Sequence, residues 1–378
     1  MARRNDISRR DFLTASACAC GACALAGAPL LAMNANRQQP PNLHEARYYE
    51  KLPNRKIRCQ LCPRECVIDD METGYCGVRE NHGGVYYTLV YGKPCTANID
   101  PIEKKPLFHF LPGTDAFSIA TVGCNVLCKF CQNWQISQAR PDQVPSMDMP
   151  PTRVAETAGK HRCASIAYTY TEPVIFSEYM FDSAKAGHVK KIKSVMISNG
   201  YIKPEPMKDL CTVLDAVKID LKSFTEDFYQ KMVNGHLQPV LDTLVLVKQS
   251  GVWLEIVYLI IPTLNDGTQE LRHMCQWINK ELGPDVPIHF SRFYPQYRLK
   301  NLPPTPVETL TTAREIALDS GLHYAYIGNV PGNTGENTYC PHCQALLIRR
   351  MGYTVVQNSL AQVNHCSKCG EAIAGVWQ

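Results

Sequence analysis

The stretch Gly123–Gln132, GCNVLCKFCQ, constrains this chain more than any other, because it groups three cysteines and has no fourth one nearby. A structural zinc site closes with four ligands, and an electron-carrying [4Fe–4S] cluster is usually held by four thiolates. Three thiolates can bind three irons of such a cluster and leave the fourth iron open. Cys124, Cys128 and Cys131 therefore predict a catalytic metal centre with an open coordination position.

The sequence around this stretch predicts an α/β fold. Apolar, β-rich runs alternate with helical patterns from about residue 116 to 330, and no Gly-x-Gly-x-x-Gly loop interrupts them, which favours a barrel of parallel strands over a dinucleotide fold. The expected strands are Phe117–Val122, Ser165–Tyr170, Ser194–Ser198, Ala216–Leu221, Val252–Ile261, Pro287–Phe290 and His323–Ile327. The expected helices include 174–187, 205–214, 268–281 and 306–320. Cys124 follows the first strand, at the carboxyl ends where barrel enzymes build their active sites.

The C-x3-C-x2-C spacing, with Phe130 before the last cysteine, resembles the signature of the radical S-adenosylmethionine (SAM) enzymes. The alternative is three buried, unligated cysteines. The resemblance implies that SAM is the missing ligand and chelates the open iron of a [4Fe–4S] cluster. It also implies reductive cleavage of SAM to a 5′-deoxyadenosyl radical, with Phe130 packed near the adenine.

Other strand ends supply candidate SAM contacts. Radical SAM enzymes have a Gly-Gly-Glu-Pro-like segment that contacts the methionine amine, and the resemblance assigns that role to Glu172 of TYTEP. The alternative is a glutamate that merely favours the first turn of a helix. Ser198 and Asn199 end the third strand and Asn329 follows the last one, so we expect all three near the cofactor.

The fourth strand carries charge on one face. Period two places Lys218, Asp220 and Lys222 together and Ile219 and Leu221 opposite them. If the charged face is the inner one, Asp220 and Lys222 need partners such as the ribose or carboxylate of SAM. If it is the outer one, the charges are ordinary helix-facing groups. Asp220 and Lys222 also match an Asp-Leu-Lys segment of the pyruvate formate-lyase activating enzymes.

Later strands offer candidates for the substrate end of the site. Arg292 is the best candidate for an anion clamp, because a guanidinium binds carboxylate or phosphate with two hydrogen bonds. Glu255, His289 and Ser291 are weaker candidates, and a lone histidine is more often structural than catalytic.

Two further cysteine groups flank the predicted barrel among the eighteen cysteines of the chain. The C-terminal group resembles a zinc ribbon, whose two C-x-x-C corners close a tetrahedral site for zinc or a single iron; a disulfide-paired tail is the alternative. The N-terminal group predicts either zinc or a second iron–sulfur cluster. The C-terminal ligands are Cys340, Cys343, Cys366 and Cys369, and the N-terminal ones are Cys59, Cys62, Cys66 and Cys76.

The first residues resemble an export signal. Arg9 and Arg10 form a twin-arginine pair before an Ala-rich stretch that is too weak for a confident membrane span. We therefore expect export by the twin-arginine route to the periplasm, either released or anchored to the membrane. This route carries proteins that are already folded around a cofactor, which agrees with metal-bound cysteines.

Several segments together resemble the radical SAM enzyme of the AmmeMemoRadiSam system, a relative of the pyruvate formate-lyase activating enzymes. Among them are DPIEKKPLFHFLPG, YTYTEPVIFSEY, KIDLKSFTEDFY and YIGNVPG. The resemblance implies a partial (β/α) barrel and Memo-like or Amme-like partner proteins. The expected organisation is a leader at 1–35, a linker and Cys-rich module at 36–115, the radical SAM partial barrel at 116–332 and a zinc-ribbon-like tail at 333–378.

The predicted function is a radical SAM enzyme that abstracts hydrogen from a substrate or a partner protein and takes electrons from a separate donor. A glycyl-radical-enzyme activase is the second interpretation, and an exported Fe–S electron carrier is the third. A nucleic-acid-binding ribbon is disfavoured, because the net charge of +4 is small for 378 residues.

Overall fold

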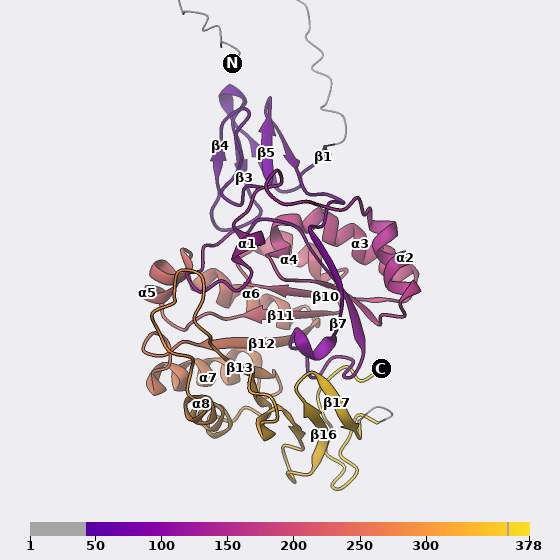
Figure 1. The fold of residues 1–378 in the computed structure, drawn as a ribbon, viewed down its shortest axis with the longest axis vertical. Helices are drawn as coiled ribbons and strands as arrows, with labels where there is room; N and C mark the ends of the chain where they lie inside the picture. The colour runs from indigo at the N-terminus through magenta and orange to yellow at the C-terminus, as the bar shows by residue number, and fades with distance from the viewer. Residues whose placement is uncertain (1–42, 361–362) are drawn as a thin grey trace, which may run out of the picture. The chain divides into compact units, whose positions relative to one another are not determined.

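An eight-stranded sheet forms the centre of the fold, with the strand order β14-β13-β12-β11-β10-β9-β8-β7 (Figure 1). The computed structural model describes residues 43–360 and 363–378. Seven of the strands run parallel, and only β7 is antiparallel to its neighbour β8. The strands are β7 Thr96–Pro101, β8 Asp115–Ala120, β9 Ser165–Tyr168, β10 Lys193–Ser198, β11 Ala216–Asp220, β12 Trp253–Ile260, β13 Ile288–Arg292 and β14 Ala325–Gly328. The predicted leader, residues 1–35, lies outside the described residues.

The seven parallel strands confirm the alternating pattern read from the sequence, whereas β7 was not predicted. Its sequence, TANIDP, contains Asn, Asp and Pro, which disfavour strands. Proline is tolerated there because β7 is the edge of the sheet and pairs on one side only.

Helices follow the parallel strands and cover one face of the sheet (Figure 1). The longer ones are α2 Pro151–Lys160, α3 Ser177–Val189, α4 Pro204–Cys211, α6 Gln238–Gln249, α7 Thr268–Leu282 and α8 Val307–Asp319. Shorter ones are α1 Trp134–Ser137, α5 Glu226–Phe228, the 3-10 turns Pro53–Arg55, Ile102–Lys104, Pro173–Phe176 and Thr334–Glu336, and the π-helical turn Tyr229–Val233. No helix within residues 43–360 and 363–378 has the length and apolar content to cross a bilayer.

The two faces of the sheet pack against different parts of the chain. On β11, Val217 and Ile219 join the large apolar core with the helices, while Ala216 joins a smaller core with the segment 102–111. Since strand side chains alternate, Lys218 and Asp220 lie on the face away from the helices. The charged face of this strand is therefore the inner one, which is the first of the two alternatives that the sequence left open.

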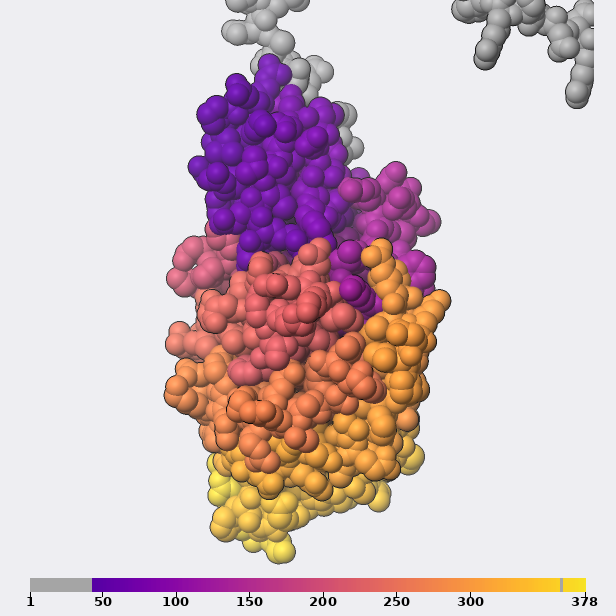
Figure 2. Space-filling model, turned by 90° about the vertical axis from the view of Figure 1, so that its left-hand side faces the viewer, coloured from indigo at the N-terminus to yellow at the C-terminus, as the bar shows by residue number. Residues whose placement is uncertain are grey.

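Small sheets flank the central one. Two three-stranded sheets precede it, in the orders β1-β6-β5 and β2-β3-β4, and a third, β15-β16-β17, follows it. Their strands are β1 His44–Glu45, β2 Tyr49–Lys51, β3 Ile57–Cys59, β4 Val67–Ile68, β5 Arg79–His82, β6 Val85–Thr88, β15 Thr338–Tyr339, β16 Leu346–Met351 and β17 Thr354–Asn358. In the space-filling view the indigo N-terminal strands rest directly on later parts of the chain (Figure 2).

Candidate active site

The three-cysteine loop begins directly after β8 and is held in place by backbone hydrogen bonds. Leu127 N donates to the carbonyl of Val233 over 2.9 Å and Lys129 N to that of Met232 over 2.9 Å, so the loop pairs with the π-helical turn. All three thiols are free of disulfides. The fold therefore fixes three thiols at the carboxyl end of the first parallel strand.

Burial makes Cys124 and Cys128 poor acids on their own. Desolvation, followed by the charge of Glu172, raises the pKa of Cys124 well above the usual value. Desolvation also raises the pKa of Cys128 to about 12, although the nearby Lys222 opposes the shift. A metal ion that replaces the proton removes this penalty. The donor set thus fits an iron–sulfur cluster on thiolates.

Glu172, Ser198 and Asn199 meet beside the cysteine loop. Glu172 Oε1 accepts from Ser198 Oγ over 2.6 Å and from Val174 N over 3.1 Å, and Oε2 accepts from Asn199 N over 2.8 Å. Asn199 Nδ2 in turn lies 3.9 Å from Cys124 Sγ. Three residues from the ends of two neighbouring parallel strands are thereby joined to the cysteine loop.

Burial raises the pKa of Glu172 to about 7, even though its three donors favour the ionised form. The carboxylate is 2% exposed. A buried carboxylate of this kind is stabilised by a cation, and the ammonium of an amino acid supplies both the charge and hydrogen-bond donors.

Asp220 is bound by two lysines on the inner face of β11 and just beyond it. Lys222 Nζ lies 2.9 Å from Asp220 Oδ2, and Lys218 Nζ binds the other oxygen. Against the effect of burial, these lysines lower the pKa of Asp220 to about 2. Lys222 also lowers the pKa of Cys128, which places this charged group close to the loop.

The structure also locates the remaining predicted cofactor contacts, of which Phe130 belongs to the cysteine loop and Arg292 and Asn329 do not. The Phe130 ring is buried and lies 5.8 Å from the ring of Phe228. Arg292 donates from Nε to the Thr305 carbonyl over 2.8 Å, and Asn329 donates to the Arg292 carbonyl over 3.2 Å. Arg292 and Asn329 are thus joined to each other at the β13–β14 edge of the sheet.

Glu255 and His289, two of the weaker candidates for the substrate end, pair with each other. Both sit near the starts of their strands, and His289 Nε2 lies 2.7 Å from Glu255 Oε2. Glu255 also accepts from the backbone N–H groups of Phe108 and His109 over 3.0 and 2.8 Å. This carboxylate anchors the segment that covers the inner face of the sheet.

Sequence reasoning missed a second buried charged group. Lys105 Nζ lies 2.6 Å from Asp100 Oδ2, and the Tyr170 hydroxyl binds the same carboxylate. Burial lowers the pKa of Lys105 to about 8. The paired lysines of DPIEKKP between apolar residues were the available signal, because a charge in an apolar segment needs a partner.

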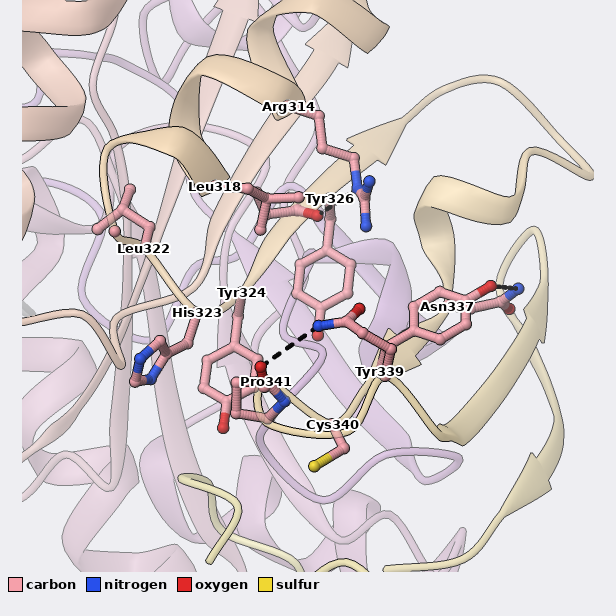
Figure 3. Close-up of a pocket in the computed structure, with 13 residues that line it drawn as sticks. Arg314, Leu318, Leu322, His323, Tyr324, Tyr326, Asn337, Tyr339, Cys340 and Pro341 are labelled. Atoms are coloured by element: carbon pink, nitrogen blue, oxygen red, sulfur yellow. Dashed lines mark hydrogen bonds between the residues drawn. The ribbon is translucent and has the colours of Figure 1, made fainter. Parts of the chain in front are cut away.

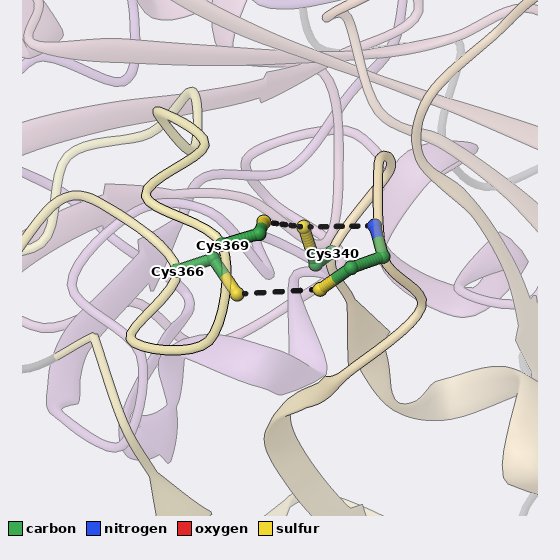
Figure 4. A group of neighbouring side chains, drawn as sticks. Cys340, Cys366 and Cys369 are labelled. Carbon is green, nitrogen blue, oxygen red and sulfur yellow. Dashed lines mark hydrogen bonds between the residues drawn. The ribbon is translucent and has the colours of Figure 1, made fainter.

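The C-terminal cysteine group closes tightly (Figure 4). Cys340 Sγ lies 3.6 Å from Cys369 Sγ, and Cys343 Sγ lies 3.6 Å from Cys366 Sγ. All four sulfurs lie within 4.8 Å of one another. Sulfurs around one tetrahedral ion with metal–sulfur bonds of about 2.3 Å are about 3.8 Å apart. The group can therefore hold a single metal ion.

The N-terminal cysteine group (Cys59, Cys62, Cys66 and Cys76) does not close in this way. Among the described residues, the C-terminal group is the one set of three or more candidate ligands whose atoms all lie within 4.8 Å. The expected N-terminal Cys-rich module is thus not seen as a compact single-ion site.

A cavity of about 280 Å³ lies away from the cysteine loop (Figure 3). It is lined by α8, the start of β14 and the C-terminal cysteine segment, including Arg314, Tyr324 and Pro341. Because it opens at the amino end of a parallel strand, it is not part of the candidate active site.

Comparisons with known proteins agree with the site. The sequence model of the family described as the Radical SAM superfamily matches residues 118–278. A Methanocaldococcus jannaschii protein described as uncharacterized is 48% identical over 332 residues, which cover 88% of this chain and 99% of that protein.

Two solved structures show weaker similarity. A radical SAM methyltransferase from Sphaerobacter thermophilus has a TM-score of 0.48 at 14% identity, covering 60% of this chain and 71% of that one. A domain of pyruvate-formate lyase-activating enzyme from Bacteroides vulgatus has a TM-score of 0.39 at 17% identity, covering 44% and 99%.

Proposed function

Because the chain belongs to the radical SAM superfamily, we propose that it cleaves SAM reductively and uses the 5′-deoxyadenosyl radical to abstract hydrogen from a substrate or a partner protein. The observation that carries this proposal is the meeting of Glu172, Ser198 and Asn199 beside Cys124. When bound, a [4Fe–4S] cluster supplies one electron to SAM.

The chain's own residues fit both groups. Cys124, Cys128 and Cys131 would hold three irons; Cys128 is buried and the other two are partly buried, which limits the access of water to the thiolates. Glu172 would accept hydrogen bonds from the ammonium of SAM. Ser198 and Asn199 donate to the Glu172 carboxylate and hold it in position. Lys222 carries a positive charge next to Cys128 and Asp220 a negative one, so this pair would bind the carboxylate or ribose.

The open eight-stranded sheet supports a finer proposal, a partial (β/α) barrel of the radical SAM type. The segments quoted from the sequence support membership of the AmmeMemoRadiSam group and a Memo-like or Amme-like partner. The Arg9-Arg10 pair supports twin-arginine export. The sulfur separations of 3.6 Å support zinc in a ribbon formed by the C-terminal cysteine group.

The test is anaerobic. The protein is reconstituted with iron and sulfide, reduced with dithionite and given SAM, and 5′-deoxyadenosine is measured against Cys128→Ala. We expect product from the native protein and none from the variant. No product from a fully loaded, reducible cluster would overturn the proposal and favour the electron carrier.

A glycyl-radical activase is the second candidate, supported by the Asp-Leu-Lys segment at Asp220–Lys222. It predicts a glycyl radical signal by electron paramagnetic resonance (EPR) when the loaded enzyme and SAM are mixed with a co-encoded partner. Absence of that signal alongside normal SAM cleavage would remove this candidate.

A further inference from the structure

The N-terminal cysteine group gathers around the β3–β4 hairpin. Cys59 ends β3, and its N–H donates to the Cys66 carbonyl over 2.9 Å. Cys59 and Cys62 are buried, and all four thiols are free of disulfides. A Cβ added to Gly74, two residues before Cys76, would lie 3.3 Å from the Ile68 side chain of β4. The segment that carries Cys76 therefore packs against the hairpin that carries the other three cysteines.

The separation of the sulfurs distinguishes two kinds of metal site. The C-terminal group has sulfur separations of 3.6 Å, which suit one tetrahedral ion. No three sulfurs of the N-terminal group lie within 4.8 Å of one another, and the same holds for Cys124, Cys128 and Cys131 among the described residues. In a cluster each thiolate binds a different iron, so its ligand sulfurs stand farther apart than those around one ion. The N-terminal group, like the active-site loop, is therefore not arranged around a single ion in the described part of the chain.

Two buried donors face this group. The Tyr86 hydroxyl acts on the Cys59 thiol, where it opposes the rise in pKa that burial causes. Arg79 is 0% exposed, and its charge lowers the pKa of both Cys59 and Cys76 against the effect of burial. Its terminal nitrogens bind Glu178 over 3.0 and 2.5 Å, but Nε has no hydrogen-bond partner. The Arg79 side chain therefore keeps one buried donor free beside its ion pair with Glu178, and its positive charge acts on Cys59 and Cys76.

The same group lies against the active-site loop. A Cβ added to Gly123 would meet the Cys76 carbonyl oxygen and a Val78 methyl at 2.7 Å each, and the φ angle of Gly123 is +96°. Only glycine permits this approach, and the next residue is Cys124. The Arg64 guanidinium also binds the Asn125 carbonyl. No side chain separates the two cysteine segments at this contact.

We propose that the N-terminal cysteine group holds an iron–sulfur cluster that passes electrons to the cluster on the active-site loop. The identity of the electron acceptor, the active-site cluster, rests on the proposed function. A low-potential one-electron donor of the ferredoxin or flavodoxin class reduces this cluster and is oxidised by one electron. The same electron then moves to the active-site cluster, and the N-terminal cluster returns to its oxidised state. No bond or proton is exchanged in this step.

The decisive test leaves the N-terminal group intact. The triple variant Cys124→Ala, Cys128→Ala, Cys131→Ala is reconstituted with iron and sulfide, and its metals and dithionite-reduced EPR spectrum are measured. We expect up to about four irons per chain and a reducible cluster signal, both lost when Cys62→Ser is added. Cys211→Ser, at a lone half-buried cysteine on α4, is the matched control and should keep both. Zinc in place of iron, or no iron, would overturn the proposal.

A second measurement tests the placement of the cluster. Tyr86→Phe in the triple variant removes a hydroxyl that favours the Cys59 thiolate, so we expect unchanged iron content and a lower midpoint potential. An unchanged potential would contradict a cluster at this position.

The electron-transfer role is tested by changing the donor. In the otherwise native chain, Cys62→Ser should slow SAM cleavage driven by reduced flavodoxin more than cleavage driven by dithionite, which can reach the active-site cluster directly. Equal slowing with both donors would overturn the transfer role. The iron and EPR readouts of the triple variant need no SAM cleavage, so failure of the proposed function would be seen separately, as fully loaded native protein that yields no 5′-deoxyadenosine.

Discussion

Glu172→Gln is the substitution that most directly tests the active site. Glutamine keeps the shape of the side chain but removes the charge that would bind the ammonium of SAM. A hydrogen bond to a charged group contributes about 1.5–3 kcal/mol, and each 1.4 kcal/mol is tenfold in affinity. We therefore expect the dissociation constant of SAM to rise about 10- to 100-fold.

The assay is equilibrium binding of labelled SAM to anaerobically reconstituted protein, with iron content and circular dichroism matched between variants. Asp215→Asn is the control, because Asp215 also accepts from a backbone N–H, that of Ser194 over 2.8 Å, and from two side chains. Asp215 lies just before β11, at the amino ends of the parallel strands, whereas the cysteine loop lies at their carboxyl ends. A change below about threefold for Glu172→Gln would refute the assigned role.

The pH dependence of binding follows from the same residue. Burial raises the pKa of Glu172 to about 7, so the carboxyl is protonated below that pH and must lose its proton before it can pair with an ammonium. SAM affinity in the native protein should fall by up to about tenfold per pH unit below 7. The part of this slope that belongs to Glu172 should vanish in Glu172→Gln; an unchanged slope would assign it to another group.

Three further predictions concern stability and metal content. Glu178→Gln leaves the buried Arg79 without its charged partner and should lower the free energy of unfolding in urea by about 3–5 kcal/mol. Arg79 lowers the pKa of Glu178 against the effect of burial. The stabilisation by this pair in the native protein should therefore be complete above the usual carboxyl pKa and should be lost as the pH falls through the lowered pKa. Asp220→Asn leaves two buried lysines without their carboxylate partner and should lower the free energy of unfolding by about 3–5 kcal/mol. It should also weaken SAM binding, as measured by equilibrium dialysis. Cys343→Ser should remove one metal ion per chain by elemental analysis, while His342→Ala beside it should retain that ion; equal metal in both variants would contradict the ribbon.

The parallel part of the sheet was predictable from local sequence. Parallel strands are buried on both faces and appear as apolar runs, such as SIAY at β9 and SVMIS within β10. The edge strand β7 was not predictable, because its pairing depends on a neighbour and its own residues disfavour strands. Side-chain period alone also left the face of Lys218 and Asp220 open, until the apolar partners of Ile219 were known.

The sequence by itself determined the chemistry: the uneven spacing of three cysteines, a glutamate after a strand and the paired C-x-x-C corners are local patterns that need no neighbours to be recognised. Only the tertiary structure decided which distant segments meet. It joined Glu172 to Asn199, assigned Glu255 to a structural anchor, and brought Cys76 against Gly123. These contacts arise from how strands stack and which faces they bury, and that information is spread over the whole sheet rather than held in any one segment.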